Sequence, residues 1–129
     1  MTVSTYLERQ YPLVAVADLR IANIGTGNGI AVKVPVGALV TVKAHVVTAF
    51  DSATTTTISA SDGTSTHISA KDAKAAALTN VTVDIPTKFY PSGGTITFTM
   101  AETGATATVG RILATVEYVV LNRGNEVQG

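Results

Sequence analysis

An alternation of apolar and polar residues between Val40 and Phe50 constrains the fold of this chain more than any other feature. Apolar side chains occupy the even positions 40, 42, 44, 46 and 50, whereas Thr41, Lys43 and His45 lie between them at odd positions. Because successive side chains of a β-strand point to opposite faces, this period of two predicts a strand with one buried face and one exposed face. Such strands bury their apolar faces by packing sheet on sheet.

The strand belongs to a longer stretch, Val34–Gly63, that is predicted to form a central hairpin. Pro35 and Gly37 mark a corner before the strand, and Asp51-Ser52-Ala53 is typical of a turn. Residues 54–60 then return with Thr, Ser and Ile at strand-compatible spacing. We expect the two strands to pair with each other at the centre of the molecule.

The remaining segments extend the same pattern and contain one expected helix. Alternating or continuously apolar runs predict further strands at residues 13–24, 30–34, 80–85, 95–100 and 105–122. The first of these is expected to be buried, and the last is apolar on both faces, as in a strand that is central or lies under an interface. Ser69 and Asp72 match a capping box, so a helix of about two turns is expected near residues 69–78. Residues 88–94 are expected to form a loop.

Together these signals predict an all-β fold. The expected architecture is an antiparallel β-sandwich, jelly-roll-like, with seven to eight strands and one short helix near residues 69–78. The length of 129 residues fits one domain. We expect the sandwich to span residues 13–122, with an N-terminal arm at residues 1–12 and a C-terminal tail at residues 123–129.

Composition argues against several classes of partner. Only 14% of the residues are charged and nine basic residues balance nine acidic ones, so we expect no surface for nucleic acid or anionic lipid. No apolar run approaches the ~20 residues of a membrane span. The N-terminus has neither the basic nor the apolar region of a signal peptide, and we expect a protein made and used without translocation. Cysteine is absent, which excludes disulfides and thiolate metal sites.

The polar residues do not form a recognisable catalytic or metal-binding motif. The two histidines, His45 and His67, lack the spacing of a zinc site, and no Gly-x-Ser-x-Gly elbow marks a serine nucleophile. A turn, a helix cap and an outward strand face account for Asp62, Asp72 and Asp84. We therefore expect a protein that is not an enzyme and has no catalytic residue, metal or cofactor.

Candidate contacts with a partner come from the terminal segments and from one aromatic pair. Two tyrosines in a free N-terminal arm would leave contact area unused, so the arm is expected to pack on a neighbouring subunit; the alternative is a loosely held terminus. The adjacent aromatics of residues 88–94 either anchor a partner or form a small core beneath their loop. The expected interface residues are Tyr6, Leu7, Tyr11, Phe89, Tyr90 and Arg123.

Several segments carry a resemblance to a known family. They are residues 11–19 (YPLVAVADL), 34–38 (VPVGA), 47–51 with Ser-Asp-Gly-Thr at 61–64, 68–72 (ISAKD) and 114–120 (ATVEYVV). In this order and spacing the chain resembles the capsid decoration, or cement, proteins of tailed bacteriophages. The segments span most of the chain, and each is mainly strand and turn chemistry.

The resemblance implies a jelly-roll-like sandwich that oligomerises, binds the major capsid protein on the outside of an HK97-like head and bridges capsomers. It implies a structural protein of the virion exterior, synthesised in the host cytoplasm, without enzymatic activity or cofactor. The alternatives are a tail-tube, head–tail connector or head-fibre-base subunit, or a small ligand-binding β-sandwich. A homodimer is favoured over a trimer, since an antiparallel sheet edge pairs readily with its own two-fold copy.

Overall fold

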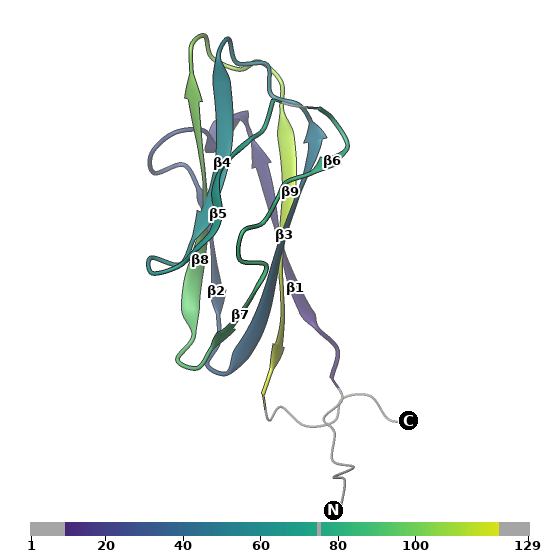
Figure 1. Cartoon of the computed structure of the whole chain (residues 1–129), viewed down its shortest axis with the longest axis vertical. Helices are drawn as coiled ribbons and strands as arrows, with labels where there is room; N and C mark the ends of the chain where they lie inside the picture. Colours follow the sequence, from purple (N-terminus) through teal and green to yellow (C-terminus); the bar gives the residue numbers. More distant parts are fainter. Residues whose placement is uncertain (1–9, 75, 122–129) are drawn as a thin grey trace, which may run out of the picture.

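The chain folds into two antiparallel β-sheets that pack face to face, which confirms the predicted all-β sandwich (Figure 1). The structure is a computed structural model, and it describes residues 10–74 and 76–121. One sheet has five strands: β1 (Leu13–Arg20), β9 (Arg111–Val120) and β3 (Ala38–Thr48) lie in that order, and β6 (Thr79–Asn80) and β7 (Thr87–Tyr90) both pair with the far edge of β3. The other sheet has four strands in the order β2 (Ile30–Val34), β8 (Gly94–Thr103), β4 (Thr55–Ser61) and β5 (Thr66–Asp72). A single 3₁₀ turn, η1 (Ile21–Asn23), follows β1.

The core lies between the two sheets and is built from the alternating positions that the sequence pattern marks as apolar. From Ala38 to Val46 the even positions of β3 are buried and its odd positions face outward, as predicted. β8 and β9 alternate in the same way over residues 95–100 and 111–116. The largest fully buried apolar side chains come from both sheets and from one connection: Leu19, Phe50, Ile58, Ile68, Ile96, Phe98 and Ile112.

The predicted central hairpin does not form, because its two strands belong to different sheets. β3 pairs with β9, β7 and β6, whereas β4 pairs with β8 and β5. The intervening segment crosses from one sheet to the other, with Phe50 and Ser52 buried in the crossing. The Asp51 carboxylate accepts hydrogen bonds from the backbone N–H groups of Thr108 and Val109, which ties the crossing to the loop before β9. The period of two therefore predicted the strands correctly, but their pairing wrongly.

The helix predicted near residues 69–78 is also wrong. Residues 66–72 form β5, and the described residues between β5 and β6 contain no helix. The side chain of Asp72 does accept a hydrogen bond from the Lys74 N–H, at 2.8 Å, but this bond makes only a local turn. Ala73 is fully buried, donates its N–H to the Thr56 carbonyl oxygen and accepts from the Phe50 N–H. These long-range bonds take the backbone groups that a helix would have used.

The segment before β8 also departs from the prediction, since the expected strand and the expected loop exchange places. Residues 80–85 were expected to form a strand and residues 88–94 a loop, whereas only Thr79–Asn80 and Thr87–Tyr90 are strands. Between them the chain follows the edge of β3 through isolated bonds, such as Val42 N–H to the Pro86 carbonyl oxygen and Val81 N–H to the Ala44 carbonyl oxygen. Pro86 cannot donate a hydrogen bond, so a continuous ladder is interrupted there.

β9 and β1 occupy different environments in the five-stranded sheet. The predicted central position of the last strand is confirmed, because β9 lies between β1 and β3. The expectation of a buried first strand is wrong, since β1 is an edge strand whose outward side chains Val14 and Val16 are 53% and 63% exposed.

Gly110 provides a test of how tightly the crossing segment packs. A Cβ atom on Gly110 would lie 2.2 Å from the Phe50 ring, whereas a Cβ on Gly63 would meet nothing within 4 Å. Both glycines have positive φ, so alanine adds backbone strain of about 1–3 kcal/mol at either position. We expect Gly110→Ala to lower the free energy of unfolding by a further 1–3 kcal/mol or so, the usual cost of overpacking. Chemical denaturation of Gly110→Ala and Gly63→Ala measures the difference, and equal losses would contradict this packing.

Candidate functional site

An exposed apolar patch lies on the outer face of the five-stranded sheet. Leu39 pairs with Phe89 of β7 on one side and with Val119 of β9 on the other, so the three side chains form one row across three strands. Leu39 is 45% exposed and Phe89 is 43% exposed. Two further exposed side chains belong to the segments at this end of the sheet: Val36 in the turn before β3, and Leu121 after β9, where the Leu121 N–H donates to the Gly37 carbonyl oxygen at 2.8 Å. We call these five residues the terminal patch: Val36, Leu39, Phe89, Val119 and Leu121.

Both ends of the described chain lie beside the terminal patch. Leu121 is itself a member, and Gln10 is fixed to the adjacent end of β9. Figure 1 shows that β1 begins and β9 ends at the same end of the sandwich. The Gln10 side-chain amide donates to the Val120 carbonyl oxygen and accepts from the Val120 N–H, each at 2.8 Å. The amide thus binds β9 as a neighbouring strand would, and it fixes where the chain enters the fold.

The outer face of the four-stranded sheet has a different chemistry. Ser59 pairs with Thr99 and Ser61 with Thr97, and the hydroxyls of Thr55 and Thr103 lie 2.6 Å apart. This face therefore presents small hydroxyl groups where the five-stranded sheet presents Leu, Val and Phe. Exposed apolar surface that is contiguous marks interaction sites more often than scattered apolar residues do, which favours the terminal patch as the contact surface.

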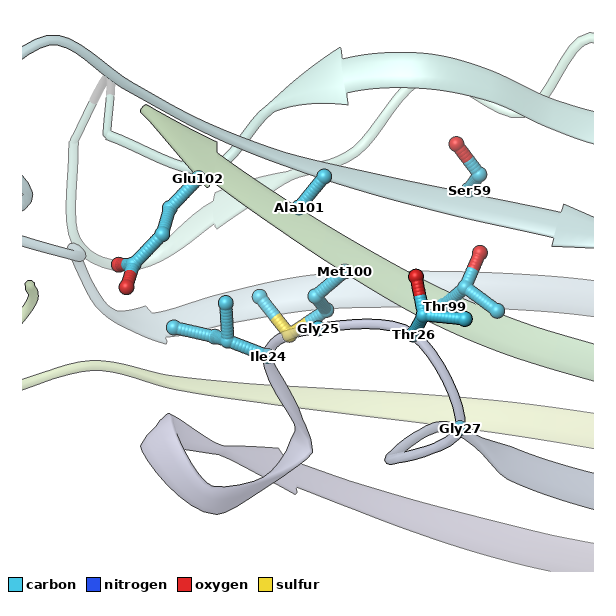
Figure 2. A pocket seen from close by; sticks show the side chains of 9 residues that line it. All are labelled: Ile24, Gly25, Thr26, Gly27, Ser59, Thr99, Met100, Ala101 and Glu102. Carbon is cyan, nitrogen blue, oxygen red and sulfur yellow. The ribbon is translucent and has the colours of Figure 1, made fainter. Parts of the chain in front are cut away.

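A groove of about 620 Å³ lies where residues 24–27 pass beside β8 (Figure 2). Ser59, Thr99 and Thr26 gather at one end of it, and Glu102 lies at the other. The Glu102 carboxylate is already bound by the Ser52 hydroxyl at 2.7 Å and by the Ala107 N–H at 3.1 Å. The lining therefore supplies hydroxyl and backbone groups, without the paired nucleophile and base of an acyl-transfer site.

The most extensive polar cluster of the described residues lies between the sheets, with its polar groups within hydrogen-bond distance of one another. The Tyr90 hydroxyl donates to Asp62 at 2.7 Å and lies 2.7 Å from Nε2 of His67. Because a carbonyl oxygen can only accept, Nδ1 of His67 donates to the Ile85 carbonyl oxygen, at 2.7 Å. Lys88 Nζ also binds Asp62, at 2.7 Å. Since Tyr90 belongs to β7 and Asp62 and His67 to the β4–β5 hairpin, the cluster joins the two sheets.

The charges of this cluster follow from its hydrogen bonds. Burial by itself raises the pKa of Asp62, but donors from Lys88, the Ser65 N–H and Tyr90 outweigh it and hold that pKa far below its usual range. Burial and the neighbouring Asp62 carboxylate raise the pKa of Tyr90. Asp62 is therefore charged and Tyr90 neutral at neutral pH. Every polar group of the cluster serves the fold.

Several other acidic residues are held in surface ion pairs: Asp18 with Arg20 and Arg111, and Asp84 with Lys71. His45 is separate from His67: Nδ1 of His45 lies 2.8 Å from the Asn80 side-chain oxygen on the outer side of β3, whereas His67 is buried in β5 of the other sheet. Across residues 10–74 and 76–121, no group of three or more His, Asp or Glu side chains is placed to hold a metal ion. The same residues contain no helix that is long and apolar enough to cross a membrane.

The structure divides the predicted interface residues into three groups. Tyr6, Leu7 and Arg123 lie outside the described residues. Tyr11 is exposed, and Phe89 belongs to the terminal patch. Tyr90 is a correction: it is only 5% exposed and faces the core, because neighbouring residues of a strand point to opposite faces. The sequence reasoning missed Val36, Leu39, Val119 and Leu121, although the apolar outer face of residues 105–122 was a signal for an interface.

The Tyr90 hydroxyl is expected to contribute to stability. Tyr90→Phe keeps the ring but leaves buried His67 and Asp62 each without one partner, so we expect a loss of about 1–3 kcal/mol in the free energy of unfolding. Tyr118→Phe is the matched control, since the Tyr118 hydroxyl has no hydrogen bond to any residue that the structure describes. Urea denaturation of both variants checks the expectation, which fails if the two lose the same stability.

Acid is expected to destabilise the fold only at low pH. Hydrogen bonds from Arg111 and Arg20 lower the pKa of Asp18 to about 2, and bonds from Thr108 and Val109 lower that of Asp51 to about 2. Since both pKa values are about 3.8 in the unfolded chain, the unfolded state binds more protons and stability falls as pH falls. Thermal melts should change little between pH 7 and 5 and drop steeply from about pH 4 to 2. A main loss between pH 7 and 5 would show that other groups control stability.

Comparisons with known proteins found no relative of this chain. No protein-family model, no curated protein and no solved structure matches it. A functional assignment therefore depends on the surface chemistry of the fold.

Proposed function

We propose that this protein is a structural virion protein, a capsid decoration or cement protein that binds the outer surface of an HK97-like phage head. In this role it contacts the major capsid protein, bridges neighbouring capsomers and stabilises the shell. It has no enzymatic activity and needs no cofactor. The observation that carries the proposal is the terminal patch, an exposed apolar surface beside both ends of the described chain.

The terminal patch has the composition of a protein-binding surface. Its core is an aromatic and two aliphatic side chains in one row, Phe89, Leu39 and Val119, and its members carry no charge. Interface cores are typically depleted of charge and enriched in aromatic residues. Removing such surface from water contributes roughly 25 cal/mol per Å² of apolar area.

The rest of the molecule supports a structural role. The buried Asp62–Tyr90–His67 cluster makes its hydrogen bonds within the fold, and the groove beside β8 is lined by hydroxyl, apolar and backbone groups, with its Glu102 carboxylate already hydrogen-bonded. A small module that is repeated over a shell needs little affinity at each contact, since many simultaneous contacts raise the effective affinity.

Binding to purified heads tests the proposal directly. Phage heads that lack this protein are mixed with it, sedimented and analysed for bound copies by quantitative mass spectrometry. We expect saturable binding at hundreds of copies per head, on the outside in electron micrographs. Copies in the tens at the tail or portal would instead identify a tail-tube, connector or fibre-base subunit. Failure to bind heads would contradict the proposal.

Substitution within the terminal patch tests the surface. Phe89→Ser should weaken head binding about tenfold or more, since truncating a central aromatic of an interface typically costs 2 kcal/mol or more. The matched control, Thr97→Ser, changes the outer face of the four-stranded sheet and should bind normally. Circular dichroism establishes that both variants are folded. Equal affinity of the two would place the contact elsewhere.

A further inference from the structure

β1 forms one edge of the five-stranded sheet, and its pairing with β9 has no register shift. Gln10 binds both the N–H and the carbonyl oxygen of Val120, so the backbone groups of Val120 point toward β1. Because backbone groups alternate in direction along a strand, the β1 residues that bond to β9 are the odd ones, and Val14, Val16 and Asp18 point their N–H and C=O groups away from the sheet. Arg20 fits this alternation, since its N–H binds the Asn23 side chain and not β9.

The other sheet edges within the described residues are shorter, irregular or covered. Residues 78–90 run along the far edge of β3. β5 pairs with β4 through register shifts and contains Ala70 at a positive φ of 44°. β2 has only five residues, and the fourth of them is Lys33. Bulges, lysines and prolines are the usual features that protect a sheet edge from pairing. The eight residues of β1 contain none of them.

The exposed apolar side chains of β1 gather at one end of this edge. Leu13, Val14 and Val16 are exposed, whereas Ala17 and Leu19 are buried. Asp18 is already held by Arg20 and Arg111, with N–O distances of 3.0 Å to each. Backbone groups that no described residue pairs with therefore coincide with exposed apolar side chains between residues 13 and 16.

We propose that a second copy of this chain pairs with the β1 edge, antiparallel, about a two-fold axis through Ala15. Val14 then exchanges two backbone hydrogen bonds with the partner's Val16, and Val16 with the partner's Val14. The Pro12 carbonyl oxygen accepts from the N–H of the partner's Asp18. Pro12 has no N–H group to donate, so the shared ladder ends there.

Side-chain chemistry selects Ala15 as the position of the axis. On the outer face, Val14 and Val16 of both copies meet as one cluster of four valines. On the inner face, Leu13 lies opposite the partner's Ala17, where a small side chain leaves room for it. An axis through Val16 would place Val14 opposite the partner's Asp18, and an axis through Ala17 would place Val16 there; each sets a valine against a charged group. The register through Ala15 avoids both.

The inference rests on the sheet edge and is independent of the proposed function. Side chains of paired residues point to the same face, so the two five-stranded sheets become one sheet with both terminal patches on one side. The two-fold axis relates the two patches, so they lie on opposite sides of it and face the same way. Such a dimer has two equivalent contact surfaces, as bridging requires.

Removal of one backbone donor tests the pairing. Val16→Pro deletes an N–H that no residue within 10–74 and 76–121 binds, at an edge position where proline is tolerated. The control, Val16→Thr, keeps the N–H and the β-branched shape. Sedimentation equilibrium should give twice the 13.2 kDa chain mass for the wild type and for Val16→Thr, with a dissociation constant at least tenfold weaker for Val16→Pro. A monomeric wild type, or a dimer that Val16→Pro leaves intact, overturns the proposal.

Single cysteines test the register, because the chain contains none of its own. The backbone groups of Ala15 point toward β9, so Ala15 faces the partner's Ala15 in a pair without hydrogen bonds between the two strands. The Cα atoms of such a pair lie about 4.5 Å apart, close enough for a disulfide. Ala15→Cys should therefore form a covalent dimer on mild oxidation, while Val16→Cys cross-links at least tenfold more slowly and Thr97→Cys, on the other sheet, does not. Two outcomes would overturn the proposal. One is that Val16→Cys cross-links faster than Ala15→Cys; the other is that Ala15→Cys does not cross-link although Val16→Pro disrupts the oligomer. Either would mean that the strands pair in another register, or that another strand, such as residues 1–9 of a neighbour, pairs with this edge.

Discussion

The bonds of the Tyr90 hydroxyl fix how the two sheets of this protein sit on each other. β7 belongs to the five-stranded sheet, while the Asp62 and His67 groups that bind Tyr90 belong to the four-stranded sheet. A sandwich held by apolar contacts alone tolerates small sliding of one sheet over the other, but a buried ionic network is satisfied in one arrangement only. Phe89 directly precedes Tyr90 on the same strand, so the bonds that orient Tyr90 inward also orient Phe89 outward. The terminal patch thus depends on chemistry in the core.

The strands of this fold are predictable from the sequence because their signal is local. The alternation in β3, in β8 and in β9 identifies each strand and its buried face without knowledge of any neighbour. Pairing is not local. Nothing between Phe50 and Thr55 tells whether β4 returns beside β3 or crosses to the other sheet, since both routes need a short polar connection. The helix expected near residues 69–78 failed for the same reason, because distant partners at Thr56 and Phe50 take the backbone groups of Ala73.

The terminal patch was only partly predictable. Phe89 stood out as one of two adjacent aromatics, but which of the two faces solvent depends on the register between β7 and β3. Leu39 and Val119 are unremarkable in sequence, since each lies in an apolar strand; they become surface residues only when β3 and β9 pair so that both point outward in one row. A surface assembled from three distant segments carries no contiguous motif, whereas a catalytic or metal motif of fixed spacing would have been visible.

The outer faces of the two sheets differ in chemistry, so the molecule has one face suited to partners and one suited to solvent. Partners engaged through the terminal patch and the β1 edge would both be held by the five-stranded sheet, which leaves the threonine and serine face to meet the medium. Hydroxyl groups bind water at any pH, because they do not ionise, and salt does not screen them as it screens charges. A particle coated with such faces outward would neither attract nor repel its neighbours appreciably as ionic conditions change. Its colloidal behaviour would then depend on bound water, with surface charge playing little part.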